Sequence, residues 1–130
     1  MARVLLVDDD VDIQEANKIA LEAKGHDVLL AYSAAEAREA IKTETPDVVV
    51  LDVMMERKDS GFDVAREIRA AHPNLPILML TGIHDHVDKA MRFGPDETWL
   101  PVTRFVEKPL SLEKLVAEVE ALAAEARKAR

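Results

Sequence analysis

Short runs of apolar residues recur along the chain and predict β-strands. The clearest run, residues 48–51, follows the turn-type pair Pro46-Asp47 and leads directly into Asp52. A continuous β-branched run of this kind is typical of a strand that is buried on both faces of a parallel sheet. The predicted strands are residues 4–7, 26–31, 48–51, 76–80 and 104–107. We expect the second strand, which has a shorter apolar run, to lie at an edge of the sheet.

Between these strands, apolar residues recur every three or four positions, which predicts amphipathic helices. Asp10, Ser33 and Ser111 occupy N-cap positions, and Glu36 stands where it completes a capping box with Ser33. Gly25 is placed to end the first helix. The predicted helices are residues 11–24, 34–44, 62–71 and 112–126, with a short helix at 84–92. The side of the first helix that faces the core is predicted to carry Ile13, Ala16, Ala20 and Ala23.

Strands that alternate with helices, without a repeat or a linker, specify an α/β fold with helices on both faces of the sheet. At this length, right-handed crossovers favour a flavodoxin-like, doubly wound, five-stranded parallel sheet with strand order 2-1-3-4-5. In that order the first and third strands are neighbours. We therefore expect Asp8, Asp9 and Asp52 in one crevice at the carboxyl ends of the strands, flanked by Thr81 and Lys108.

The length and composition indicate one domain. The chain has 130 residues, of which 48% are hydrophobic, enough to fill a single core. We expect a single domain over residues 1–130, with no output domain after the last helix. The apolar runs are far shorter than the roughly 20 residues that cross a bilayer, and the amino terminus does not have the pattern of a signal peptide. We expect a cytoplasmic protein without membrane contact.

The charge and the absence of cysteine exclude several classes of function. The chain has no cysteine, which excludes disulfides, thiolate catalysis and zinc sites built on cysteine. Lys and Arg number 17 against 25 Asp and Glu, a net charge of -8. A charge of this sign repels phosphate backbones, which argues against direct nucleic-acid binding.

The predicted crevice has the composition of a magnesium site that supports phosphoryl transfer. Three carboxylates placed close together repel one another unless some are protonated or a cation holds them. Oxygen ligands without Cys or His fit Mg²⁺, which takes one or two carboxylates and keeps several waters. With a metal, a lysine and a hydroxyl beside it, a carboxylate can attack phosphorus. Asp52 is then the residue that becomes an aspartyl phosphate.

The chain resembles the receiver domain of bacterial two-component response regulators. The resemblance covers residues 1 to about 126, and it rests on four short motifs, each at the end of a predicted strand. Their residues are 7–10 (Val-Asp-Asp-Asp), 51–52 (Leu-Asp), 80–82 (Leu-Thr-Gly) and 107–109 (Glu-Lys-Pro). Each motif is weak alone, and the combination in this order is highly specific.

The resemblance implies a role for each matching residue. Asp52 is implied as the phosphoacceptor, and Asp8 and Asp9 as the acid pair that holds Mg²⁺, with Asp9 the direct ligand and Asp8 acting largely through water. The metal set would also include Asp52 and the backbone carbonyl of Met54.

The resemblance also implies a switch. Thr81 would bond a phosphoryl oxygen, Lys108 would pair with another, and Phe105 stands at the aromatic switch position, where Tyr is common. Phe105 can move into the space that Thr81 vacates, but it cannot make the hydroxyl hydrogen bond. Glu56 replaces a proline that is common in the family, and the segment between Thr81 and Lys108 is longer than usual.

Three classes of function follow, and the first is preferred. A receiver would take its phosphoryl group from a histidine kinase or a histidine phosphotransfer protein and signal to a downstream protein, with a homodimer left open. It would not be an enzyme beyond its own phosphorylation and dephosphorylation. The alternatives are an adaptor that is never phosphorylated and a phosphatase of the haloacid-dehalogenase type. The Asp-x-Asp motif of that phosphatase family is absent, because Asp52 is followed by Val53-Met54.

Overall fold

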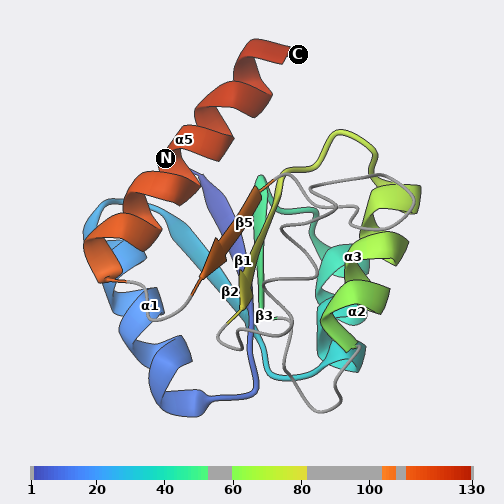
Figure 1. Ribbon diagram of the computed structural model, residues 1–130, viewed down its shortest axis with the longest axis horizontal. Helices are drawn as coiled ribbons and strands as arrows, with labels where there is room; N and C mark the ends of the chain where they lie inside the picture. The colour runs from blue at the N-terminus through green and yellow to red at the C-terminus, as the bar shows by residue number, and fades with distance from the viewer. Residues whose placement is uncertain (1, 53–59, 82–103, 108–110, 130) are drawn as a thin grey trace.

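The computed structural model describes residues 2–52, 60–81, 104–107 and 111–129. Helices and strands alternate along the described chain, as the apolar pattern predicts (Figure 1). The elements are β1 (Arg3–Val7), α1 (Val11–Ala23), β2 (Asp27–Ala31), α2 (Ala34–Thr43), β3 (Val48–Asp52), α3 (Ser60–Ala71), β4 (Ile77–Thr81), β5 (Arg104–Glu107) and α5 (Leu112–Ala129). The short helix predicted at residues 84–92 lies outside the described residues.

The strands form a parallel sheet in the order β2-β1-β3-β4-β5. The predicted α/β fold, the order 2-1-3-4 and the edge position of β2 are confirmed. In β1, Val7 pairs in register with Ala31 of β2 on one side and with Leu51 of β3 on the other. The backbone of β5 lies beside β4, with Glu107 opposite Thr81. This order brings the ends of β1 and β3 together although 40 residues of chain separate Val7 from the start of β3.

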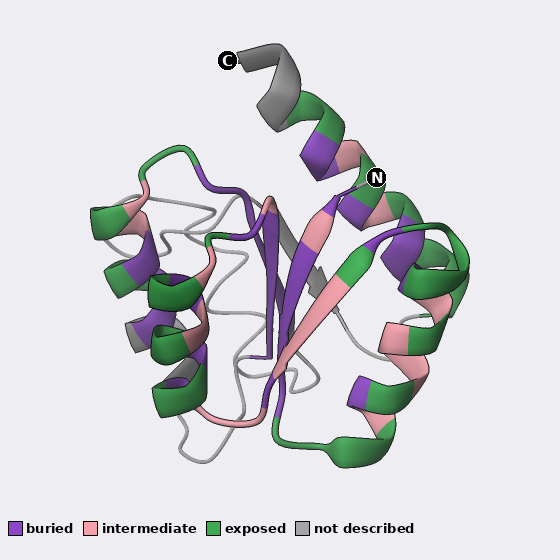
Figure 2. Cartoon of the chain, turned by 180° about the vertical axis from the view of Figure 1, so that it is seen from behind, coloured by how far each residue is buried: buried purple, intermediate pink, exposed green. Residues whose placement is uncertain are grey.

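Helices cover both faces of the sheet. In Figure 1, α1 and α5 lie on one face, and α2 and α3 lie on the other. Because side chains alternate between the faces of a strand, each of the strands β1 to β4 contributes to two cores. Leu5 and Val7 join the core under α2 and α3, whereas Val4 and Leu6 join the core under α1 and α5. Figure 2 shows the central strands as buried over almost their whole described length.

The predicted helix caps are observed. The Asp10 side chain accepts a hydrogen bond from Ile13 N–H, the Ser33 hydroxyl from Glu36 N–H, and the Ser111 hydroxyl from Lys114 N–H. Gly25 ends α1 with a φ of 87°, which a residue with a side chain rarely adopts. The capping box differs in one detail, because the Glu36 carboxylate accepts from Tyr32 N–H rather than from Ser33 N–H.

The inward face of α1 agrees with the prediction only in part: Ala20 packs against the core, and Ile13 and Ala16 are half-buried. Ala23 is exposed, and the buried residues of the helix are Gln14 and Leu21. These two residues are seven positions apart, two helical turns, so they lie on one line along the helix. A polar residue, Gln14, therefore occupies a core position that the apolar pattern did not assign to it.

Within the described residues, no helix is both long enough and apolar enough to cross a membrane.

Candidate functional site

Two buried aspartates lie at neighbouring strand ends. Val7 and Leu51 are register partners in β1 and β3, and the next residues along the two strands are Asp8 and Asp52. Adjacent strands are about 4.8 Å apart, so the backbones at these two positions run side by side. Asp8 is only 4% exposed and Asp52 only 5%. The structure thus brings together two of the three acids that were predicted to share a crevice.

Both aspartates belong to the same side of the sheet. The Asp8 N–H donates to the Ala31 carbonyl (3.1 Å), so pairing with β2 continues one residue beyond β1. Strand alternation assigns Asp8 to the side of Leu6, and Asp52 to the side of Val50. Leu6 and Val50 pack in the core under α1 and α5. Both residues lie at the carboxyl ends of their strands, where β1 leads into α1. This is the lower edge of the sheet in Figure 1.

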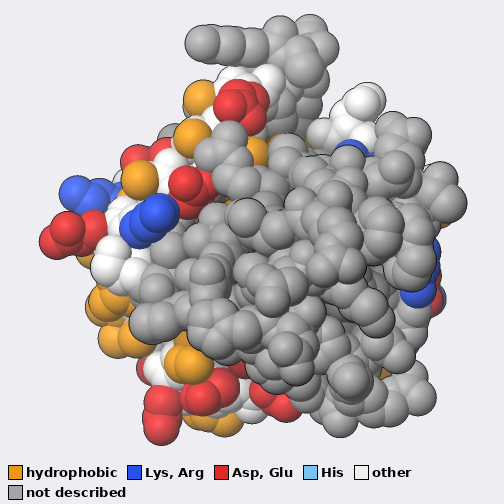
Figure 3. All heavy atoms as spheres, viewed as in Figure 1, with side chains coloured by type: hydrophobic (Ala, Val, Ile, Leu, Met, Phe, Trp, Pro, Cys, Tyr) orange, Lys and Arg blue, Asp and Glu red, His pale blue; other side chains and the backbone are white. Residues whose placement is uncertain are grey.

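The loop from β1 to α1 carries the other acids. Asp10 N–H donates to Asp8 Oδ1 (2.9 Å), Ile13 N–H donates to Asp10 Oδ1 (3.1 Å), and Gln14 N–H donates to the Asp10 carbonyl (3.0 Å). Asp10 is thus the N-cap of α1, as expected, and Asp9 between them is exposed. Figure 3 shows acidic side chains gathered at the lower margin of this face, near the point where β1 leads into α1. The loop combines a buried acid, a solvent-facing acid and a capping acid.

Gln14 is a polar residue of this region that the sequence did not single out. Its side chain is buried, with 1% of the residue exposed. The side-chain nitrogen donates to the carbonyl oxygens of Leu6 and Ala31, both at 2.9 Å. Glutamine on a helix is usually solvent-exposed, so no local pattern distinguishes it. Gln14 lies on the same side of α1 as Leu21, and its burial becomes apparent only when the inward face of the helix is known.

The donors at this edge fit a hard cation. Asp8 and Asp52 offer carboxylate oxygens from two neighbouring strand ends, and Asp9 offers a third from the loop. Mg²⁺ takes one or two protein carboxylates and keeps several waters, so a pair of acids suffices. Within the described ranges, no group of three or more His, Asp or Glu side chains is close enough to form a metal site by itself. A metal here would depend on two carboxylates, on water and on donors such as the Met54 carbonyl, which lies outside the described residues.

The remaining predicted site residues lie on β4, on β5 or outside the described chain. Thr81 ends β4 one residue beyond Leu80, the register partner of Asp52. Phe105 is paired in backbone register with Met79. Lys108 directly follows Glu107, whose partner is Thr81, but Lys108 and Glu56 lie outside the described residues. The predicted roles of these side chains remain predictions.

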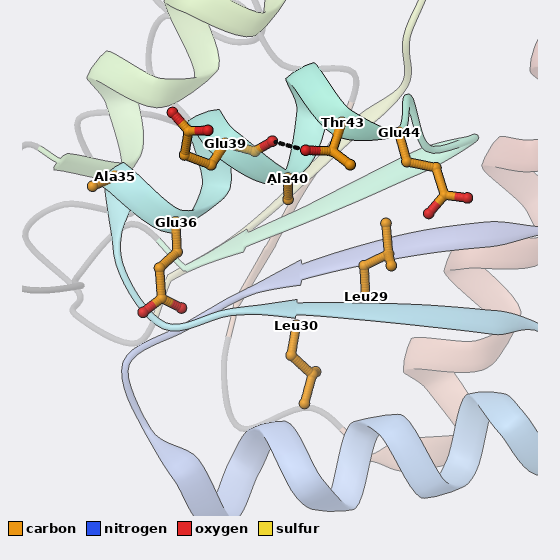
Figure 4. Close-up of a pocket in the computed structure, with 8 residues that line it drawn as sticks. All are labelled: Leu29, Leu30, Ala35, Glu36, Glu39, Ala40, Thr43 and Glu44. Carbon is orange, nitrogen blue, oxygen red and sulfur yellow. Dashed lines mark hydrogen bonds between the residues drawn. The ribbon is translucent and has the colours of Figure 1, made fainter.

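A surface groove lies elsewhere, at the β2 edge of the sheet. It has a volume of about 510 Å³. Figure 4 shows Leu29 directed toward α2 and Leu30 directed to the opposite side of β2, with Thr43 Oγ1 donating to the Glu39 carbonyl at 3.0 Å. The lining residues are Leu29, Leu30, Ala35, Glu36, Glu39, Ala40, Thr43 and Glu44. Because β1 separates β2 from β3, this groove is not part of the site around Asp52.

Comparison with known proteins yields one family. The model of the response regulator receiver domain matches residues 4–120. Response regulator MprA of Mycobacterium ulcerans is 39% identical over 123 residues, which cover 92% of this chain and 49% of the relative. The chain spans about half the length of the curated relatives that it matches.

Solved structures agree in fold. The crystal structure of the receiver domain of NtrX from Brucella abortus superimposes with a TM-score of 0.80 at 30% identity, covering 93% of this chain and 98% of that one. A response regulator receiver domain protein from Clostridium thermocellum has a TM-score of 0.83 at 28% identity, with complete coverage of both chains (100%). The order of the strands, the acids at the ends of β1 and β3 and these matches lead to one conclusion: the chain belongs to the response regulator receiver domain family of two-component signal transduction.

Proposed function

We propose that Asp52 accepts a phosphoryl group from a phosphohistidine of a histidine kinase or a histidine phosphotransfer protein, in a reaction that requires Mg²⁺. The observation that carries the proposal is the burial of Asp8 and Asp52 at adjacent strand ends. Burial of a carboxylate is costly unless hydrogen bonds or a cation compensate for it. Two buried acids at neighbouring strand ends support a functional role for this edge of the sheet.

The transfer involves one bond made and one bond broken. An Asp52 carboxylate oxygen attacks the phosphorus, the bond between the phosphorus and the donor's imidazole nitrogen breaks, and its electron pair stays on the imidazole. In this proposal Asp9 would bind Mg²⁺ directly, Asp8 would act largely through water, and the Asp52 carboxylate and the Met54 carbonyl would complete the protein ligands. When bound, the ion would supply positive charge that balances the phosphoryl oxygens.

Three other residues act on the phosphoryl group or respond to it. Lys108 pairs with one phosphoryl oxygen and the Thr81 hydroxyl donates to another. As Thr81 moves inward, Phe105 follows and changes the surface near β5. Such a switch shifts an existing equilibrium between two conformations rather than building a new fold. Support comes from the strand register, which puts the backbones of Thr81 and Glu107 opposite each other and Lys108 next in sequence.

The proposal extends to the setting in which these residues act. Residues 1–130 form one receiver domain with the complete five-stranded sheet, and it works in the cytoplasm. Its partners are the phosphodonor protein and a downstream target protein. A homodimer is left open, and the oligomeric state in solution is the measurement that decides it. The net charge of -8 supports partners other than nucleic acid for this domain. The only reactions of the domain are its own phosphorylation and dephosphorylation.

Intact mass spectrometry tests the phosphoacceptor. The protein is incubated with acetyl phosphate and Mg²⁺, beside a Mg²⁺-free sample and Asp52→Asn. We expect a gain of about 80 Da, the mass of one phosphoryl group, only in the wild-type sample with Mg²⁺. Equal labelling of Asp52→Asn would identify a different acceptor.

Absence of any adduct leads to a second measurement on the same protein. Beryllofluoride forms a stable mimic of an acyl phosphate, and a change in Trp99 fluorescence that needs Mg²⁺ would show that the adduct forms but decays too quickly to trap. No adduct and no Mg²⁺-dependent change together would favour the adaptor that is never phosphorylated.

A further inference from the structure

The buried amide of Gln14 connects helix α1 to two strands at once. Gln14 lies in the first turns of α1, and its side-chain nitrogen donates to Leu6 in β1 and to Ala31 at the end of β2. A primary amide has two N–H donors, so these two bonds use both of them. The side chain thereby links the start of α1 to the carboxyl ends of β1 and β2.

The acid loop is held between those attachment points. On the strand side, Ala31 O accepts from both Asp8 N–H and Gln14 Nε2. On the helix side, Asp10 O accepts from Gln14 N–H. The loop of Asp8, Asp9 and Asp10 is therefore held at both ends. Asp8 shares the Ala31 carbonyl with the Gln14 side chain, and the Asp10 carbonyl accepts from the Gln14 backbone. Movement of α1 away from the sheet would move the loop and its carboxylates with it.

A buried glutamine can also be purely structural. In that case its two hydrogen bonds would stabilise the fold as a whole, as any satisfied buried amide does. The position of its acceptors points to a more specific role. Both acceptors adjoin the acid loop, because Leu6 is two residues before Asp8 and the Ala31 carbonyl also accepts from Asp8 N–H.

We propose that Gln14 is a positioning residue for the magnesium site, which holds the loop of Asp8 and Asp9 in the geometry that binds the ion before the ion arrives. The proposal rests on the proposed function, because it assumes that these acids bind Mg²⁺. Gln14 does not contact the metal. Partners that orient metal ligands typically contribute 10–100-fold to metal affinity, and pre-organisation of the ligands is the physical reason.

Gln14→Met is the variant that isolates the two bonds, because methionine has nearly the same length and removes the donors. The matched control is Asp47→Ala, which removes a hydrogen bond from Arg3 N–H (2.8 Å) at the opposite end of the sheet. Labelling with acetyl phosphate is measured against Mg²⁺ concentration, and Mg²⁺ affinity is measured separately by calorimetry without phosphodonor.

We expect Gln14→Met to weaken Mg²⁺ binding by about tenfold, the lower end of the range for residues that orient ligands. Labelling at saturating Mg²⁺ should match wild type, since Asp52 itself is unchanged. Asp47→Ala should keep wild-type Mg²⁺ affinity. If Gln14→Met is folded and binds Mg²⁺ as wild type does, or if Asp47→Ala loses affinity to the same extent, the proposal is wrong. If wild type neither binds Mg²⁺ nor is labelled, the proposed function itself fails.

A measurement on the wild-type protein covers the case in which Gln14→Met does not fold. In a ¹⁵N-labelled sample, the two side-chain amide protons of Gln14 should exchange slowly with water and shift when Mg²⁺ saturates the site. The chain has no other glutamine, so the exposed side-chain amide of Asn74 is the control, and it should not shift. Rapid exchange of the Gln14 protons, or no shift at saturating Mg²⁺, would overturn the positioning role.

Discussion

Strand β3 has an aspartate at each end, and the two have different surroundings. Asp47 precedes the strand, and it forms two hydrogen bonds with one residue of β1: its carboxylate accepts from Arg3 N–H at 2.8 Å, and its own N–H donates to the Arg3 carbonyl at 2.7 Å. Asp52 ends the same strand, is 5% exposed, and lies beside the position of Asp8. Asp47 joins two strands by hydrogen bonds, whereas Asp52 ends its strand beside the strand that leads into Asp8.

The difference extends to the whole of each end of the sheet. At the amino end, buried His26 accepts from Ala2 N–H at 3.0 Å and contacts Glu120 Oε2 at 2.9 Å. At the carboxyl end, a run of acids enters α1, and the amide of Gln14 bonds strand carbonyls. In a parallel α/β sheet, ligands bind outside the carboxyl ends of the strands. Residues at the amino ends can therefore serve to stabilise the contacts between strands. Substitutions at the carboxyl end should therefore lower labelling and leave the fold intact. Substitutions at the amino end should lower the unfolding free energy and leave labelling unchanged.

The largest effect is expected for Asp52→Asn. Labelling by acetyl phosphate should fall to the level of the Mg²⁺-free control, because the amide is a poor nucleophile toward phosphorus. Asparagine fills the same space, so the fold should persist. Intact mass and circular dichroism on the same sample measure both properties. Loss of the folded signal along with labelling would contradict a purely chemical role for Asp52.

The next effect is expected at the amino end, for His26→Phe. Since Nδ1 of His26 accepts from Ala2 N–H, Nε2 carries the proton and donates to the Glu120 carboxylate. Phenylalanine would leave the Ala2 N–H without its acceptor, which costs about 2 kcal/mol of unfolding free energy. Urea denaturation measures the loss.

The labelling rate gives the control for His26→Phe. It should remain at the wild-type level under conditions where the variant is folded, because His26 lies at the other end of the sheet from Asp52. Slower labelling of a fully folded variant would show that the two ends are not independent.

A smaller loss is expected for Asp47→Ala. The variant removes the acceptor of Arg3 N–H but leaves the backbone bond from Asp47 N–H to the Arg3 carbonyl. The unfolding free energy should fall by about 1 kcal/mol, the usual value for one intramolecular hydrogen bond. Asp47→Asn keeps a carbonyl oxygen that can accept, so it should lose less. Equal losses for the two substitutions would show that the charge, not the hydrogen bond, stabilises this end.

The smallest effect is expected for a surface ion pair that belongs to neither end. Arg38 of α2 donates to both carboxylate oxygens of Glu67 in α3, at 2.5 and 3.0 Å. Both side chains are about half exposed, 43% and 51%. Arg38→Met should lower the unfolding free energy by roughly 0.5 kcal/mol, and salt should reduce the difference. A loss larger than that of Asp47→Ala would contradict the ranking of buried above exposed contacts.

Local patterns predicted the elements and their caps well. Asp10, Ser33 and Ser111 cap helices because a side-chain oxygen beside a free N–H is a local arrangement, readable from a few residues. The predicted start of the third helix at residue 62 is two residues later than the observed start at Ser60. Helix ends are the least certain part of such a prediction, because propensities on either side of a boundary are similar.

The candidate site was predicted in part. Asp8 and Asp52 were expected together from the strand order, and their burial at adjacent ends agrees with that expectation. Gln14 was missed, and Ala23 was wrongly assigned to the core. The rotation of α1 about its own axis depends on packing against the sheet and against α5, which a sequence of alanines and polar residues does not specify.

The sequence by itself determined the alternation of strands and helices, the caps and the acids at the strand ends, because each depends on residues a few positions apart. Only the tertiary structure decided which polar groups are buried and what they bond. The two acceptors of Gln14 are 8 and 17 residues away in the chain, and the partners of His26 are 24 and 94 residues away. A buried polar group is stable only when such partners are brought to it, and that requires the packed sheet.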